Sequence, residues 1–483
     1  MLDDIIRERL KKLEALKSAG IDPYPASAHR THEIGDVIAK FDELAASGEK
    51  VSVAGRIMSV RDQGKIIFAD IAGESGKIQA VLKDETTENF DLWQSTLDIG
   101  DFISVSGLVF ATKRGEKSIE AEGIQMLSKS VLPLPDKFAG IEDDEIRLRQ
   151  RYLELAVDVE VREMFRKKSV FWQSMREFML AEKFLEVETP VLEPIPGGAE
   201  AEPFITKHNA LDTDFYLRIS PELNLKRLMV GGFEKVFEIG RIFRNEGIDA
   251  EPLQDYTQME LYWAYQDYKG LMVFLEKMIK HVVKATFGTH VITHKGQEVD
   301  WAKPWLTYDY YELFEQYAGL DLTVATREDL LKRGKLLKLD QIDGRTGRGR
   351  LIDLIYKKLV RPKLVAPGFL VNPPVDIEPL AKRLPEDPGR VERFQIVAYG
   401  TELGKGFSEL NDPADQEARF TEQAKLREAG DKEAQMFDES YVRALKYGMP
   451  PTAGFGMSER FFAVLMDKPV RETVFFPLMR PKK

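Results

Sequence analysis

VFEIGRIFRNEGIDAEPLQDYTQMELYW, residues 236–263, is the stretch of sequence that decides the fold. Two β-patterned runs flank a long polar loop that begins at Arg244 and Glu246. Glu260 and Tyr262 share one face of the return strand, because side chains alternate between the two faces of a strand. Such a strand–loop–strand could hold a nucleotide phosphate with an arginine. Because the chain contains no GxxxxGK[ST] motif, the segment indicates nucleotide chemistry on an antiparallel sheet.

Composition narrows the class of protein. The 483 residues are enough for two or three domains. The absence of cysteine excludes disulfides, thiolate zinc sites, iron–sulfur clusters and a cysteine nucleophile. The chain has six histidines and no cysteine, and we expect any metal to be a hard cation held by carboxylates. No run is long enough for a membrane span and the amino terminus is charged, so we expect a cytoplasmic protein with no membrane partner.

Residues 1–50 are interpreted as a helical extension. Residues 2–17 have helical spacing, with an apolar stripe and five basic side chains. These basic side chains indicate either a solvated face or contact with nucleic acid. The net charge of −11 does not decide between the two, because phosphate binding depends on local basic patches.

Residues 51–130 are expected to form a small all-β domain. Five short β-rich runs separated by glycines predict a Greek-key barrel of the OB type. Such barrels bind single-stranded nucleic acid through side chains on one face. The candidates here are Arg56, Phe68, Gln79 and Glu120. For Phe68 the pattern alone favours core packing, whereas stacking on a base would contribute roughly 1–3 kcal/mol.

Residues 131–150 are interpreted as a linker, and residues 151–483 as an α+β domain. Helices are expected at about residues 158–184, 270–288, 413–428 and 438–447. FLEVETPVL is expected to be a strand that contains Pro190, which indicates an edge or an interface. Three further expectations are a glycine-containing turn at GFGMSER, a last strand at TVFFPL, and a flexible basic loop at GRTGRGR (344–350).

Three separated segments resemble, in order, the signature motifs of class II aminoacyl-tRNA synthetases: FLEVETPVLEP (184–194), VFEIGRIFRNEG (236–247) and GFGMSERFFAVL (454–465). The preceding OB-type domain is similar to that of the subgroup that charges aspartate, asparagine and lysine. IPGGAEAEPF, PELNLKRLMVGGFEKVFEIG and FSELNDPADQ resemble lysyl-tRNA synthetases. The resemblance implies an antiparallel sheet flanked by helices and an anticodon-binding barrel. It implies ATP, Mg²⁺, L-lysine and tRNA(Lys) as ligands, and a homodimer built around Pro190.

The resemblance also implies roles for particular residues. It implies a lysine-binding set of Gly198, Glu222, Glu260, Tyr262, Phe407 and Glu409. It implies an ATP-binding set of Arg244, Glu246, Tyr256 and Arg460, in which Arg244 and Arg460 are catalytic. It implies Mg²⁺ held by Glu402 and Glu409. The glutamates independently favour a substrate with two ammonium groups, because a carboxylate buried among apolar strand residues needs a partner.

The sequence departs from this family in four places. Lys405 stands where the family usually has Asn, and Gln395 where it often has Glu. The loop at 249–255 lacks the usual basic residues, and GFGMSER is slightly short. We interpret these departures as a divergent lineage. Three alternatives to lysine–tRNA ligation stay open: the same chemistry on aspartate, asparagine or a lysine analogue, transfer of the aminoacyl group to a protein, and a non-catalytic tRNA- or protein-binding module.

Overall fold

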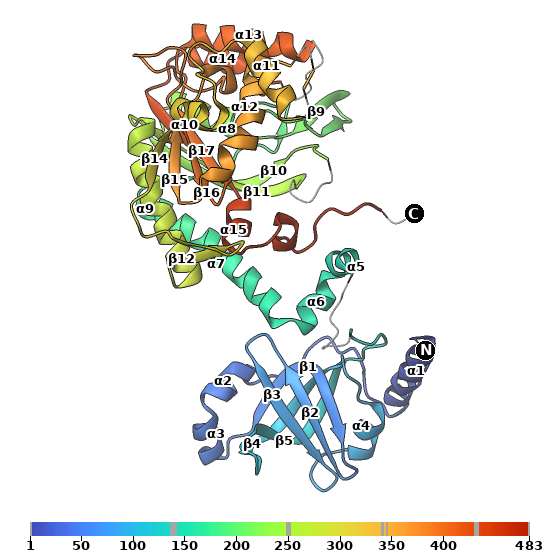
Figure 1. The fold of residues 1–483 in the computed structure, drawn as a ribbon. Helices are drawn as coiled ribbons and strands as arrows, with labels where there is room; N and C mark the ends of the chain where they lie inside the picture. The colour runs from blue at the N-terminus through green and yellow to red at the C-terminus, as the bar shows by residue number, and fades with distance from the viewer. Residues whose placement is uncertain are drawn as a thin grey trace. The chain divides into compact units, whose positions relative to one another are not determined.

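The computed structural model describes residues 2–135, 143–247, 253–339, 342–343, 346–428 and 434–481. The chain divides into two compact units (Figure 1). The barrel unit comprises Met1–Asp144 and Tyr152–Val157, and the sheet unit comprises Glu145–Arg151 and Asp158–Lys483. Within the described ranges, no helix is both long enough and apolar enough to cross a membrane.

The barrel unit is a closed barrel with the strand order β1-β2-β3-β5-β4. Its elements are α1 (Leu2–Ser18), α2 (Ile34–Ala39), α3 (Phe41–Ser47), β1 (Val51–Asp62), β2 (Ile66–Ala72), β3 (Lys77–Lys83), α4 (Phe90–Thr96), β4 (Phe102–Ala111) and β5 (Lys117–Ser128). Alternate side chains of each strand point inward, so that Val53, Ile67, Ile78, Ile103 and Ile119 share one core. The five-stranded barrel predicted from the sequence is confirmed.

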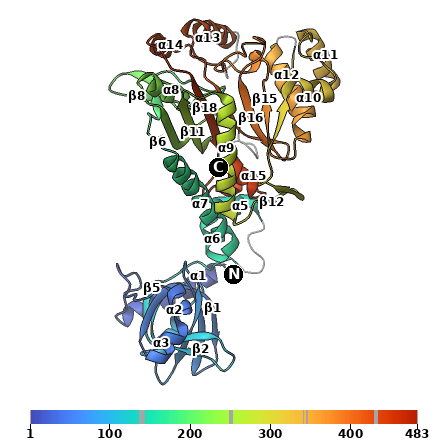
Figure 2. The ribbon, with the colours of Figure 1, turned by 90° about the vertical axis from the view of Figure 1, so that its left-hand side faces the viewer.

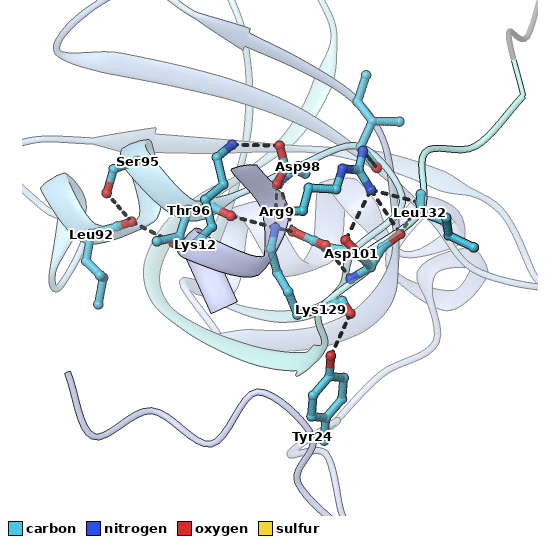
Figure 3. Close-up of polar contacts among 12 residues, drawn as sticks. Arg9, Lys12, Tyr24, Leu92, Ser95, Thr96, Asp98, Asp101, Lys129 and Leu132 are labelled. Carbon is cyan, nitrogen blue, oxygen red and sulfur yellow. Dashed lines mark hydrogen bonds and ion pairs between the residues drawn. The ribbon is translucent and has the colours of Figure 1, made fainter. Parts of the chain in front are cut away.

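Polar contacts tie α1 to the barrel (Figure 3). Arg9 is buried and donates hydrogen bonds of 2.9 to 3.1 Å to three backbone carbonyls. Lys12 pairs with Asp98 at 2.7 Å, and Asp98 also pairs at 2.6 Å with the fully buried Lys129, which reaches Asp101 at 2.8 Å. The other three basic side chains of α1 pair with acidic residues one turn away. All five basic side chains of α1, which the sequence assigned either to a solvated face or to contact with nucleic acid, therefore have partners within the barrel unit.

The sheet unit is built on eight strands in the order β14-β15-β16-β17-β18-β11-β10-β6. These are β6 (Leu185–Glu186), β10 (Lys235–Phe243), β11 (Asp255–Ala264), β14 (Leu306–Asp309), β15 (Gly368–Val371), β16 (Arg393–Ala398), β17 (Thr401–Ser408) and β18 (Thr452–Ser458). Smaller sheets contain β7 (Leu192–Glu193), β8 (Ile205–His208) and β9 (Thr213–Leu217), and β12 (Val291–His294) with β13 (Gln297–Asp300). The six central strands pair antiparallel as predicted, whereas the outer pairs β14–β15 and β10–β6 are parallel.

Helices cover both faces of this sheet (Figures 1 and 2). They are α7 (Val159–Ala181), α8 (Glu222–Val230), α9 (Tyr268–Phe287), α10 (Tyr310–Ala318), α11 (Arg327–Leu336), α12 (Arg348–Leu359), α13 (Pro413–Glu428), α14 (Glu439–Leu445) and α15 (Arg460–Leu465). Two short helices, α5 (Asp144–Arg149) and α6 (Arg151–Val157), precede α7 in the chain. α8 and α14 pack on the face that carries Tyr262 and Phe407. α9 packs on the opposite face, where Phe274 contacts both Trp263 and Phe178 of α7. The four helices predicted from periodicity are confirmed.

Three other expectations about elements are wrong. FLEVETPVL forms two short strands, β6 and β7, and Pro190 lies between them, since proline cannot donate to a ladder. GFGMS belongs to the central strand β18 rather than to a turn. TVFFPL is not a strand: the 3₁₀ helix η3 (Val470–Thr473) ends there, and Phe475 stacks on Phe165 at 3.8 Å. In the GRTGRGR segment residues 344–345 lie outside the described residues, and α12 begins at Arg348.

Candidate active site

Two rows of residues cross the middle of the sheet on one face. One row contains Val236, Tyr262, Gly454, Phe407 and Arg393, and the other contains Glu238, Glu260, Gly456, Lys405 and Gln395. Residues paired across strands present their side chains to the same face, so strand pairing gathers side chains that are far apart in sequence. The central position must be glycine, because a Cβ on Gly454 would lie 2.1 Å from Oε1 of Glu409 and 2.5 Å from the Tyr262 ring.

A buried lysine joins two of the glutamates over this face. Lys226 of α8 is fully buried, and its Nζ donates to Oε1 of Glu222 at 2.6 Å and pairs with Glu409. The Phe407 ring lies 5.3 Å from the same Nζ. Burial raises the pKa of Glu222 and, more strongly, that of Glu409. Burial opposes the charge on Lys226, but the two carboxylates outweigh it and hold the Lys226 pKa well above its ordinary value.

Glu260 is a third buried carboxylate in the same place. It accepts hydrogen bonds from Ser220 at 2.8 Å, Gln258 at 2.5 Å and the Tyr262 hydroxyl at 3.2 Å. Burial first, and then the charge of Glu222, raise the pKa of Glu260 to about 7, while the three hydrogen bonds oppose the rise. Three buried carboxylates therefore lie close enough to raise one another's pKa, and Lys226 contacts two of them.

Gly198 completes this group. Its φ is +84°, and a Cβ on it would lie 2.8 Å from the Cβ of Glu222. The structure thus brings together the whole lysine-binding set expected from the sequence: Gly198, Glu222, Glu260, Tyr262, Phe407 and Glu409. The sequence reasoning did not find Lys226. The signal was present, since a Glu and a Lys four residues apart lie on one face of a helix.

A second group of residues surrounds Tyr256 on β11. The Arg244 guanidinium lies 5.6 Å from the Tyr256 ring. Burial raises the pKa of Tyr256, and the charges of Arg244, Glu246, Glu260 and Arg460 also act on its hydroxyl. The structure therefore gathers the residues expected to bind ATP. Residues 248–252, most of the divergent loop, lie outside the described residues.

The expected pairing of Glu402 with Glu409 on one metal ion is wrong. The two residues are seven positions apart along an extended segment, which separates their backbones by about 20 Å. A register shift between Ile396 and Val397 turns Glu402 onto the same face as Gln395, and the Gln395 amide donates to Glu402 at 2.7 Å. Oε1 of Gln395 is buried and without a hydrogen-bond partner in the described structure. This oxygen and the Glu402 carboxylate fit a hard cation better than the pair expected from the sequence.

Lys405, the substituted position, has its own partner. Its Nζ lies 3.0 Å from Oε2 of Glu378, and Nε of Arg393 lies 3.2 Å from the same oxygen. Glu378 is 3% exposed, and although burial acts against its charge, Lys405 and Arg393 lower its pKa below the ordinary value. The positive charge of Lys405 is therefore compensated at the edge of the site.

The barrel unit gathers three of the four anticodon candidates. Phe68, Val81 and Glu120 are paired across β2, β3 and β5, and Gln79 lies in the next row. Phe68 is partly exposed on the outer face, so the core-packing alternative is wrong. Arg56 lies about 13 Å away along the strands, with its guanidinium 4.2 Å from the Phe102 ring. Arg61, which the sequence reasoning missed, lies 5.7 Å from the Phe68 ring.

Glu193 on β7 gives a prediction about stability. Burial, against the charges of two nearby arginines, raises the pKa of Glu193 from 4.5 to about 8. Between these values the folded chain binds a proton that the unfolded chain does not, so stability is lost as pH rises through this window. Glu193→Gln should flatten the fall in Tm between about pH 5 and about pH 8, measured by thermal unfolding. Glu186→Gln, which alters a partly exposed ion pair with Arg176, should keep the wild-type slope; a wild-type slope in Glu193→Gln would contradict the prediction.

Comparisons with known proteins agree with both units. Residues 143–480 match the family of class II tRNA synthetases for D, K and N, and residues 51–127 match the OB-fold nucleic acid binding domain. The chain therefore belongs to the class II tRNA synthetases of this group.

Full-length relatives point to one member of the group. The chain is 45% identical to the lysine–tRNA ligase of Pelotomaculum thermopropionicum, over all of this chain and 96% of the relative. It is 44% identical to the lysine–tRNA ligase of Thermotoga maritima, over all of this chain and 97% of the relative. It is also 44% identical to that of Roseiflexus castenholzii, over the full length of both chains.

Proposed function

We propose that this chain is a lysine–tRNA ligase that activates L-lysine with ATP and transfers it to the 3′ end of tRNA(Lys). The observation that carries the proposal is the cluster of the buried carboxylates Glu222, Glu260 and Glu409 over one face of the sheet. A substrate with two ammonium groups supplies the cations that these carboxylates need. In this assignment Gly198 and Glu222 receive the α-ammonium, and Tyr262 and Glu409 receive the ε-ammonium.

Glu260 and Phe407 complete the lysine site in this assignment. Glu260 supplies a further acceptor on the substrate face, and the Phe407 ring forms the wall along the methylene groups. In this assignment the substrate carboxylate is directed toward Arg244.

The first step joins lysine to the nucleotide. A lysine carboxylate oxygen attacks the α-phosphorus of ATP, the bond from that phosphorus to the bridging oxygen breaks, and pyrophosphate leaves. Arg244 binds both the carboxylate and the α-phosphate, because its planar fork suits two oxygens at once. Glu246 and Tyr256 hold the adenine, and Arg460 stabilises the phosphate charge. Positioning and charge stabilisation supply the catalysis, so no protein nucleophile is needed.

The second step charges the tRNA. A hydroxyl of the terminal ribose attacks the carbonyl carbon of the lysyl-adenylate, and AMP leaves. For recognition of the anticodon the barrel unit offers Phe68 and Glu120, which are partly exposed on its outer face. Gln79 in the next row is buried and accepts a hydrogen bond from Ser118 at 3.2 Å.

Replacing Phe68 with alanine should weaken charging of tRNA without changing lysine activation. The loss of one stacked base is worth about 1–3 kcal/mol, so the KM for tRNA should rise roughly tenfold. Aminoacylation measures this effect, and ATP–pyrophosphate exchange without tRNA measures activation. Phe102→Ala is the matched control, since Phe102 is an outer aromatic of the same barrel that packs on Arg56. Equal loss in both assays for Phe68→Ala would rule out the assigned role.

Three finer properties belong to the same proposal. Mg²⁺ would be held by Glu402 and Gln395 and would neutralise phosphate charge; titration of Mg²⁺ against Glu402→Gln tests this. A homodimer would form at the segment around Pro190, where Val191 and Leu192 are exposed, and sedimentation tests it. The site of action would be the cytoplasm, where charging of tRNA serves translation, and fractionation of cells tests it.

The experiment that tests the function is ATP–pyrophosphate exchange with each amino acid in turn. Lysine should drive exchange best. If aspartate, asparagine or a lysine analogue drives exchange faster than lysine does, that amino acid is the substrate in place of lysine. If none of the amino acids supports ATP–pyrophosphate exchange, the non-catalytic alternative would be favoured.

A further inference from the structure

The assigned site contains a cation that the proposed chemistry does not use. Lys226 is fully buried, and Glu222 and Glu409 both contact its ammonium group. The other titratable groups that act on it are Tyr441 of α14 and Glu378. A buried, doubly paired lysine inside a pocket for lysine calls for an explanation, because its ammonium group has the same chemistry as the substrate.

Charge balance gives one part of the explanation. Glu222, Glu260 and Glu409 carry three negative charges when ionised, and Lys226 neutralises one of them. Among these four side chains two negative charges remain, and the proposed substrate has two ammonium groups; Lys405, which also acts on Glu222, shares Glu378 with Arg393. Without Lys226 the pocket would hold one carboxylate more than the substrate can neutralise, and that group would have to take a proton.

Geometry gives the other part. Lys226 contacts Oε1 of Glu222 and Oε2 of Glu409, one oxygen of each carboxylate. The other oxygen of Glu409 faces Gly454 and the Tyr262 ring. Each glutamate therefore contacts Lys226 through one oxygen, and Oε1 of Glu409 is without a hydrogen-bond partner in the described structure. The four-residue spacing on α8 fixes this arrangement from a single helix.

We propose that Lys226 is a positioning residue that sets both the charge and the orientation of the substrate-binding glutamates, so that the pocket accepts a dication. This inference rests on the proposed function. It predicts that Lys226 assists the binding of lysine rather than competing with it, although its ammonium group lies between the same two carboxylates.

The test compares the wild type with Lys226→Met, which keeps most of the length of the side chain and removes its charge. In ATP–pyrophosphate exchange the KM for lysine should rise about tenfold or more near pH 7, with the KM for ATP unchanged. The defect should shrink as pH rises, because Lys226 lowers the pKa of Glu222 and of Glu409, and without it these carboxylates ionise to bind the ammonium groups only at higher pH. Lys226→Arg should restore the wild-type pH profile. Lys280→Met removes another Glu–Lys pair with four-residue spacing and a 2.6 Å contact, and it should leave both KM values unchanged.

Each outcome decides the inference. A lower KM for lysine in Lys226→Met would make Lys226 a competitor and overturn the proposal. Equal changes for both substrates with a wild-type pH profile would leave Lys226 a purely structural role and also overturn it. If Lys226→Met does not fold, Lys226→Gln carries the same comparison. Failure of the wild type to exchange with lysine would instead reject the proposed function, so the two failures are distinguishable.

Discussion

Replacing Arg244 with alanine should reduce lysine-dependent ATP–pyrophosphate exchange by roughly a thousandfold, while binding of tRNA is largely retained. Arg244 follows β10 directly, and its guanidinium lies 5.6 Å from the Tyr256 ring. It forms no ion pair with a carboxylate of the described residues, and its Nε makes a long hydrogen bond of 3.4 Å to the Ile219 carbonyl. Its charge is thus available to an anionic ligand, and the reaction develops charge on the α-phosphate beside it.

Two variants separate charge from geometry at this position. Arg244→Lys keeps a cation but loses the planar fork, so exchange should stay well below the wild type. Arg241→Ala is the control, because Arg241 lies three residues earlier, on β10, and is partly exposed and pairs with Asp255 at 2.5 Å. It should retain nearly full exchange. Exchange close to the wild type in Arg244→Ala would refute the phosphate assignment.

The alternation and periodicity of apolar residues within a segment correctly predicted the long strands and helices. The two runs of residues 236–263 are β10 and β11, paired with Glu238 opposite Glu260. The periodicity of α7 and α9 is that of helices that each pack one apolar face on the sheet unit. These elements are long and regular, so the pattern within each was sufficient.

The elements that were missed depend on partners far away in the sequence. Gly454 and Gly456 break a strand pattern, and only the neighbours of β18 explain why glycines occupy a central strand. The register shift in β17 that turns Glu402 onto the site face cannot be recognised from alternation. From the sequence we therefore expected Glu402 beside Glu409 on one metal ion, whereas the register of β16 and β17 places Glu402 beside Gln395.

Particular residues of the sites show the same limit. The resemblance to a family named the glutamates, but not the cation between them, because Lys226 became significant only when Glu409 was placed beside α8. In the barrel, Arg56 was the arginine named as a candidate from the sequence, whereas pairing of β1 with β2 places Arg61 opposite Phe68. Residues that act through a contact with another strand are found when the register is known.

Replacing Glu409 with glutamine should raise the KM for lysine about a hundredfold, with a much smaller effect on the KM for ATP. Glu409 is 1% exposed and pairs with the fully buried Lys226. The amide keeps the shape of the side chain but removes the charge that the ε-ammonium and Lys226 both use. Truncating one partner of a buried charge pair typically costs about 2–5 kcal/mol, which corresponds to a hundredfold change at roughly 3 kcal/mol.

The pattern of losses distinguishes substrate recognition from general damage to the fold. Glu417→Gln removes a solvent-exposed carboxylate that pairs with Lys446 at 3.0 Å, and it should change neither KM, since exposed pairs contribute about 0–1 kcal/mol. Norleucine lacks the ε-ammonium, so its activation does not depend on the carboxylate charge of Glu409. Exchange with norleucine should therefore fall much less in Glu409→Gln than exchange with lysine does. If norleucine and lysine lost activity equally in Glu409→Gln, Glu409 would stabilise the sheet rather than recognise the ε-ammonium. The same ratio measured in Lys226→Met would then show whether the two buried groups act on the substrate as one unit.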